Sequence, residues 1–112
     1  TDNGCTPLYV ACENGHTPVV ELLLAADGID VNEPLKSGAT PLIIASYIGQ
    51  ASCVFLLLKD PAINTTLLFQ DRTALQLAQP GSRADGWDFL EEQIKVEGRQ
   101  TVVQLLIDAG AQ

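Results

Sequence analysis

The sequence predicts an all-α solenoid of three turn–helix–helix units, because one short motif occurs three times at nearly constant spacing. The motif is Thr6-Pro7-Leu8, and it returns as Thr40-Pro41-Leu42 and more loosely as Thr73-Ala74-Leu75. Its threonines lie 40 − 6 = 34 and 73 − 40 = 33 residues apart, and an aliphatic run follows each copy. A period of this length is typical of stacked repeats, in which each unit buries its apolar face only against its neighbours.

Helix-starting and helix-ending residues alternate within the first unit. Thr6-Pro7 supplies an N-cap residue and a proline at the first helical position, and Asn14-Gly15 is suited to the end of that short helix. Thr17-Pro18 repeats the cap-plus-proline pattern, which predicts a second helix that extends to Ala26 and ends at Asp27-Gly28. The second unit has the same order, so a turn and two antiparallel helices are expected in each unit.

The third unit contains an insertion between its two helices. From the threonine to the aliphatic pair is 19 − 6 = 13 residues in the first unit and 53 − 40 = 13 in the second, but 102 − 73 = 29 in the third. About 16 residues are therefore added, within Gln79 to Glu97, if Gly98 corresponds to Gly15 and Gly49. The insertion separates two helices that are adjacent in the other units.

The inserted segment is expected to form a short amphipathic helix. Pro80-Gly81-Ser82 ends the preceding helix, and Trp87, Leu90 and Ile94 then follow at nearly helical spacing. Trp87 and Phe89 allow two interpretations. Aromatic residues in an inserted loop are typical binding anchors, but they could instead hold the insertion against the third unit.

These residues resemble the ankyrin repeat, whose period is about 33 residues and whose signature is T-P-L-H-x-A. The resemblance is closest in the first unit and covers essentially the whole chain apart from the insertion. It implies one domain, residues 1–112, with repeat 1 at 1–32, repeat 2 at 33–64 and repeat 3 at 65–112, the insertion lying at about 80–97. The family's histidine is replaced by Tyr9, Ile43 and Gln76, so fewer hydrogen bonds between neighbouring loops are expected at that position.

The resemblance implies a non-catalytic scaffold that binds a protein or peptide on a concave face made by the turns and first helices. Carried onto matching positions, the candidate partner-binding residues are Asp2, Asn3, Cys5, Glu13 and Asn14 in repeat 1, Lys36, Ser37, Tyr47 and Ile48 in repeat 2, and Leu68, Phe69, Gln70 and Arg72 in repeat 3, together with Trp87 and Phe89 of the insertion. Tyr47, Ile48, Leu68 and Phe69 could form one exposed apolar strip. Alternatively, the insertion folds over this strip.

Composition narrows the classes of partner and compartment. Fourteen acidic against six basic residues give a formal net charge of −8, which disfavours nucleic acid and anionic membranes and favours a basic protein or peptide. The acids could also serve only to keep the domain in solution. Cys12 and Cys53 occupy positions where the repeat has small or aliphatic residues, which indicates reduced core thiols in an intracellular, cytoplasmic protein. We interpret the chain as a segment of a longer protein, whose targeting signals can lie elsewhere.

Little in the sequence favours catalysis, and no cofactor or metal is expected. His16 is the only histidine, and neither a third orienting group nor a regular set of metal ligands accompanies it. Some ankyrin repeats are substrates of an asparaginyl hydroxylase, and the resemblance extends this expectation to Asn32. Two other possibilities stay open: a regulatory or substrate-recruiting segment of a larger enzyme or channel, and end-to-end self-association through uncapped terminal repeats.

Overall fold

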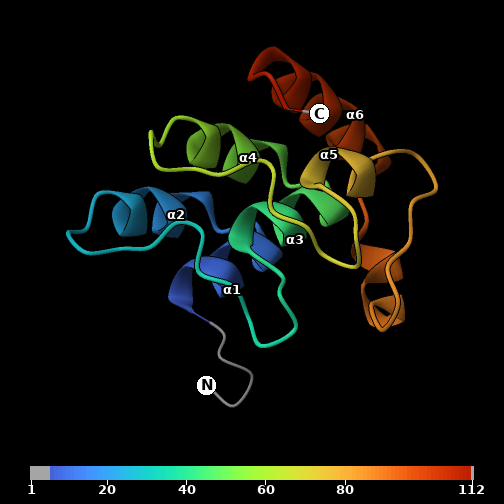
Figure 1. The fold of residues 1–112 in the computed structure, drawn as a ribbon, viewed down its shortest axis with the longest axis horizontal. Helices are drawn as coiled ribbons and strands as arrows, with labels where there is room; N and C mark the ends of the chain where they lie inside the picture. Colours follow the sequence, from blue (N-terminus) through green and yellow to red (C-terminus); the bar gives the residue numbers. More distant parts are fainter. Residues whose placement is uncertain (1–5, 112) are drawn as a thin grey trace.

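The computed structural model describes residues 6–111, and six α-helices and one 3₁₀ helix occur in this range. In chain order they are α1 Pro7–Asn14, α2 Thr17–Leu24, α3 Pro41–Ile48, α4 Ala51–Leu58, α5 Ala74–Leu77, η1 Asp88–Gln93 and α6 Val96–Asp108. The helices stack in two layers, with α3 between α1 and α5 and with α4 between α2 and α6 (Figure 1). The prediction of an all-α solenoid is confirmed.

The first helix of each repeat begins as the local sequence predicts. The hydroxyl oxygens of Thr6, Thr40 and Thr73 each accept the backbone N–H three residues further on, at 3.1, 3.3 and 3.3 Å. Gly15 and Gly49 end α1 and α3 with φ of 71° and 93°, a left-handed conformation that costs glycine little. Capping thus fixes where the inner layer of helices begins and ends.

The second helices depart from the expected pattern. Thr17 is the first residue of α2 and not its cap, because His16 takes the cap position without a side-chain hydrogen bond. The helix ends at Leu24, two residues before the expected Ala26. Packing against the inner layer holds these helices in place, because their buried positions, such as Val20, Val54, Val102 and Leu106, face the core.

Two asparagines connect the turns of neighbouring repeats. The side-chain amide of Asn32 donates to the carbonyl of Ala62 at 2.7 Å, and its oxygen accepts the N–H of Asn64 at 2.9 Å. The turn of repeat 3 is tighter: Phe69 and Arg72 exchange two backbone hydrogen bonds of 2.9 and 3.1 Å. The two residues between them have φ of 54° and 64°, as a two-residue hairpin requires.

The insertion contains a short helix, as predicted, and this helix, η1, is a six-residue 3₁₀ helix. The predicted apolar positions Trp87 and Leu90 are buried, so the pattern located the inward face but not the type of helix. Ile94 is extended and follows the end of η1. The chain then enters α6, whose first residue is Val96.

Gly98 does not end a first helix, as its correspondence with Gly15 and Gly49 had suggested, but lies in the first turn of α6. A Cβ at this position would overlap the carbonyl oxygen of Gly49. The adjacent N–H of Lys95 donates to the carbonyl of Ile48 at 2.7 Å. Glycine is therefore needed here for the close approach of two backbones.

Candidate functional site

The insertion covers the apolar strip that was expected to bind a partner. Tyr47 is fully buried, the edge of its ring meets Trp87 at a centroid distance of 4.9 Å, and its hydroxyl accepts the N–H of Ala84 at 3.2 Å. Ile48 and Phe69 are buried as well. The prediction of an exposed strip is wrong for these three residues, because aromatic and aliphatic surface is buried where the chain's own insertion can reach it.

Trp87 is also part of the buried core, because only 9% of its surface is exposed. Its ring stacks on that of Phe69 with centroids 4.5 Å apart and an interplanar angle of 20°. Of the two interpretations of the insertion, the one in which its tryptophan holds it against the stack is confirmed. Figure 1 shows the inserted segment, in orange, beside the turn of repeat 3 in yellow.

Two further candidates, Gln70 and Arg72, help to hold the insertion. The side-chain amide of Gln70 donates to the carbonyl of Asp85 and accepts its N–H, both at 2.8 Å. The guanidinium of Arg72 donates to the Ser82 hydroxyl at 3.2 Å and to the carbonyl of Arg83 at 2.7 Å. Their polar groups are therefore engaged within the chain.

Arg99 is the main polar anchor of the insertion, and the sequence analysis missed it. Only 2% of this residue is exposed, and burial lowers the pKa of its guanidinium. Its Nε donates to the carbonyl of Tyr47 at 2.6 Å, and its Nη atoms donate to those of Gln79 and Ser82 at 3.0 Å. No sequence signal could have found this arrangement, because the three carbonyls come together only in the folded chain.

Most of the remaining candidate residues that the structure describes are exposed to solvent. Asn14, Lys36 and Ser37 are exposed, as are Leu68 at 55% and Phe89 at 66%. Glu13 is half-buried, burial raises its pKa, and its carbonyl accepts a hydrogen bond from Gln50 at 2.9 Å. The candidates Asp2, Asn3 and Cys5 lie outside the described residues. The surface that remains is thus polar in repeats 1 and 2 and apolar beside the insertion.

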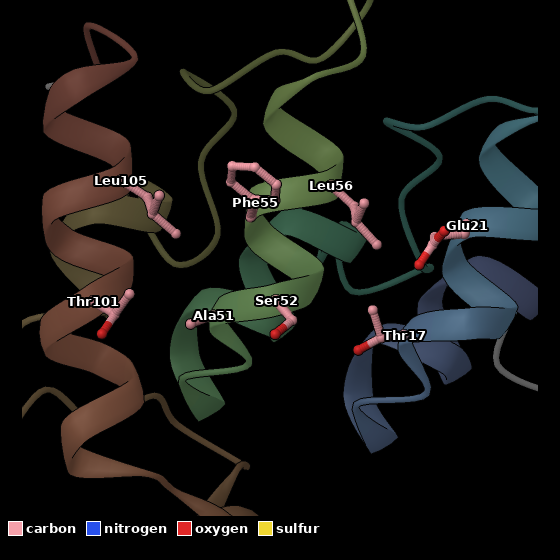
Figure 2. Close-up of a pocket in the computed structure, with 8 residues that line it drawn as sticks. All are labelled: Thr17, Glu21, Ala51, Ser52, Phe55, Leu56, Thr101 and Leu105. Atoms are coloured by element: carbon pink, nitrogen blue, oxygen red, sulfur yellow. The ribbon is translucent and has the colours of Figure 1, made fainter.

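A groove that the sequence analysis did not anticipate runs across the outer helices α2, α4 and α6 (Figure 2). Its volume is about 400 Å³, and it is lined by Thr17, Glu21, Ala51, Ser52, Phe55, Leu56, Thr101 and Leu105. Figure 2 shows Phe55 on the α6 side of α4 and Leu56 on the α2 side. Phe55 of α4 is 46% exposed, with the Lys59 ammonium 4.4 Å from its ring centroid.

A smaller, more polar pocket of about 260 Å³ lies at the junction of repeats 1, 2 and 3. Cys53 and Lys95 are among its lining residues, and Lys95 donates to the side-chain oxygen of Gln50 at 2.8 Å. Cys12 and Cys53 are buried and form no disulfide bond, which confirms the prediction that they are core residues.

The residues discussed for other chemistry are placed as follows. His16 is exposed. Both side-chain atoms of Asn32 that can form hydrogen bonds connect two turns, at 2.7 and 2.9 Å. Within residues 6–111 there is no cluster of three or more side chains that could hold a metal ion. The helices in this range are too short or too polar to cross a bilayer.

Comparison with known proteins identifies the family. The model described as "Ankyrin repeats (3 copies)" matches residues 1–68, which is more than half of the chain. The ankyrin repeat protein YahD of Escherichia coli K12 is 34% identical over 113 residues, covering 96% of this chain and 47% of YahD. The human photoreceptor ankyrin repeat protein is 45% identical over 56 residues, covering 50% of this chain and 12% of that protein.

A solved structure agrees with these matches. An ankyrin repeat domain from Acinetobacter baumannii AYE superposes with a TM-score of 0.74 at 32% identity, over 98% of this chain and 50% of the other. The chain belongs to the ankyrin-repeat family. Ankyrin repeats are generally protein–protein interaction modules and are typically not enzymes. The chain spans less than half the length of the two relatives named above and half of the solved one.

Proposed function

We propose that this chain is a non-catalytic scaffold that binds a protein or peptide on the part of the turn and first-helix face that the insertion leaves open. The observation that carries the proposal is the exposure of Leu68 and Phe89, at 55% and 66%, beside the buried Phe69 and Trp87. Large apolar side chains that stay in water next to a packed cluster are typical anchors for a partner.

The rigidity of the insertion supports this choice of surface. Phe89 follows Trp87 by two residues and lies in η1, while Leu68 directly precedes Phe69. Stacking of Trp87 on Phe69 therefore fixes the backbone that carries both exposed residues. A partner would lose little free energy in ordering this surface, because its frame is already ordered.

Charge around Phe89 supports a basic partner. Asp88, Glu91 and Glu92 of η1 are exposed beside it, and Glu91 has one cation nearby, Arg83, at 3.8 Å. Together with the net charge of −8, these carboxylates would attract a peptide in which an apolar anchor is flanked by lysine or arginine. The same field would repel nucleic acid and anionic membranes.

Selection of peptides from a random display library on the immobilised protein tests the proposal. The selected peptides should be basic with an aromatic or aliphatic anchor, and NMR shift changes should centre on Leu68 and Phe89. The Leu68→Ser, Phe89→Ser double variant should weaken their binding by about tenfold or more. Leu22→Ser, which alters a leucine on α2 that is 74% exposed, is the control. Shift changes centred on Phe55 and the outer groove would contradict the proposed face.

The alternative proposal is that these repeats regulate, or recruit substrates to, a larger enzyme or channel. The greater length of the relatives supports it. Ankyrin repeat and SOCS box protein 11 of Danio rerio supports it as well: it is 43% identical to this chain over 54 residues, and the match covers 18% of that protein. Its name joins ankyrin repeats to another module. If the alternative holds, removing the repeats from the full-length protein should abolish capture of a macromolecular substrate but not turnover of a small one.

We also propose a reducing, intracellular location. The support is that Cys12 and Cys53 are free thiols, and free buried thiols are typical of proteins from reducing compartments. Hydroxylation of Asn32 stays a prediction. Because the Asn32 side chain already joins two turns, incubation with a hydroxylase should modify the folded domain more slowly than a peptide of residues 24–36.

A further inference from the structure

The groove across the outer helices continues along the whole length of α2 and α4. A second hollow of about 390 Å³ lies where these two helices end, and it shares Glu21 and Leu56 with the groove of about 400 Å³ described above. Together the two hollows, here called the outer groove, reach from Thr17, the first residue of α2, to Ala25, which follows its last. At 1.5 Å per residue this is a length of about 12 Å, or two turns of an α-helix.

The lining of the outer groove is largely apolar and remains in contact with water. Phe55 is 46% exposed, and Leu24, Leu56 and Leu105 are half-buried. Figure 2 shows Phe55 and Leu56 on opposite sides of α4, so this helix offers apolar surface both toward α6 and toward α2. Covering such surface is favourable in proportion to the area removed from water.

The walls of the outer groove favour a helix as the partner. They are helices that lie side by side, with α4 between α2 and α6 (Figure 2). Backbone groups inside a helix are paired with one another, so a strand would find no free edge along these walls. A helix needs no such edge, and its side chains can pack between those of two parallel helices.

One charged group in the outer groove has no partner. Of the charged lining residues, Lys59 lies over the ring of Phe55 at 4.4 Å, and Asp60 accepts the N–H of Ala62 at 2.8 Å. Among residues 6–111 the carboxylate of Glu21 has neither a hydrogen bond nor an ion pair. Figure 2 shows it on the side of α2 that faces Leu56. A cation on the partner is the group that complements this carboxylate.

We propose that the outer groove is a second docking surface, which binds an amphipathic α-helix of a partner protein. The apolar stripe of that helix lies along Phe55 and Leu56, and a lysine or arginine beside the stripe pairs with Glu21. The apolar contact supplies most of the affinity, and the ion pair selects the partner. This surface goes beyond the function proposed above, because Leu68 and Phe89 take no part in it.

A peptide held as a helix tests the proposal. The probe is a stapled, fluorescent peptide of about 15 residues, with leucines spaced three and four residues apart and a lysine beside them. A preformed helix is used because a flexible peptide must lose conformational entropy to become helical in the groove. Fluorescence anisotropy should show binding to the whole chain, and NMR shift changes should centre on Phe55 and Leu56. A scrambled peptide without the apolar stripe should not bind, and equal binding of both peptides would overturn the proposal.

Variants of the groove separate apolar contact from charge, and circular dichroism first shows that each is folded. Phe55→Ser should weaken binding of the lysine peptide by about tenfold or more. Glu21→Lys should weaken it by about fivefold, and a peptide with glutamate in place of the lysine should prefer this variant over the parent. Glu33→Lys, which changes an exposed acid outside the groove, is the matched control. An equal effect at Glu33 and Glu21 would show that only net charge is recognised.

Two further outcomes bear on the site and its occupant. The Leu68→Ser, Phe89→Ser double variant should bind the helical peptide as the parent does, so loss of the first surface and loss of this one can be told apart. Shift changes at Leu68 and Phe89 instead of Phe55 and Leu56 would overturn the proposed site. Dimers of the protein alone that Phe55→Ser abolishes would overturn the choice of occupant, because a second copy would then fill the groove.

Discussion

The ring of Trp87 stacks on the ring of Phe69 at a centroid distance of 4.5 Å, and this contact joins the insertion to the turn of its own repeat. Tyr47 of the preceding repeat also packs against Trp87, with ring centroids 4.9 Å apart and an interplanar angle of 66°. An insertion that could have been a free loop is thereby part of the core.

Trp87→Ala should lower the free energy of unfolding by about 3 kcal/mol, because it removes a largely buried aromatic side chain from the cluster. It should also expose Phe69 and Tyr47, which is measurable as binding of a hydrophobic dye. Phe89→Ala is the matched control: its side chain is mostly exposed, so chemical denaturation should change by less than about 0.5 kcal/mol. Equal effects of the two variants would mean that the insertion is not anchored by Trp87.

Arg99→Met should destabilise the domain by about 2 kcal/mol or more, because three buried or partly buried carbonyls lose their donor. Arg99→Lys should restore only part of the loss, since an ammonium cannot reproduce the planar arrangement of donors. Urea denaturation measures both. Arg83→Met, which breaks an exposed ion pair of 3.8 Å, should have little effect, and a similar loss there would contradict the assignment.

Gly98→Ala should destabilise α6 even though alanine is the better helix former by about 1 kcal/mol. A Cβ at this position meets the backbone carbonyl of Gly49, so α6 must move away from α3. We expect a net loss of about 2 kcal/mol in thermal or chemical unfolding. Gln100→Ala, an exposed change in the same helix, should be neutral or slightly stabilising, and the same result at Gly98 would show that the helices can separate without cost.

Glu13 makes stability depend on pH. Burial raises its pKa above the ordinary value of 4.5, so between these two values the folded chain binds more protons at this site than the unfolded chain. Stability therefore falls as pH rises through this window. Glu13→Gln should be slightly more stable than the parent at pH 7 and equal to it near pH 3.5, as measured by urea denaturation at both. A difference that persists at the lower pH would contradict the explanation.

Weak end-to-end association is expected at high concentration. Helices α1 and α2 lie at one end of the described stack and α6 at the other (Figure 1). Val10 of α1, Leu22 of α2 and Ile107 of α6 are exposed. Association of two copies through these ends would bury this apolar surface, which a neighbouring repeat covers inside a longer array. Sedimentation analysis should detect dimers that the Leu22→Asp, Ile107→Asp double variant abolishes and Phe89→Asp does not. A clean monomer at millimolar concentration would contradict the prediction.

The sequence by itself determined the repeats and the ends of their first helices. A threonine that caps its own helix, and a glycine that ends it, act within four residues, so Thr6, Thr40 and Gly15 could be assigned correctly without knowledge of the fold. The aliphatic runs likewise identified the elements that build the core. Local periodicity could not tell which side chains of α4 would stay in water, and for that reason Phe55 and the outer groove were missed.

Only the tertiary structure decided what becomes of the first-helix face. The insertion has no counterpart in the other repeats, so periodicity said nothing about where it would lie, and its Trp87 packs against the buried rings of Tyr47 and Phe69. Arg99 reaches a carbonyl 52 positions away. Contacts of this kind depend on how far one backbone can approach another, as at Gly98 and Gly49, and that distance is set by packing between elements and not by the local preferences of either one.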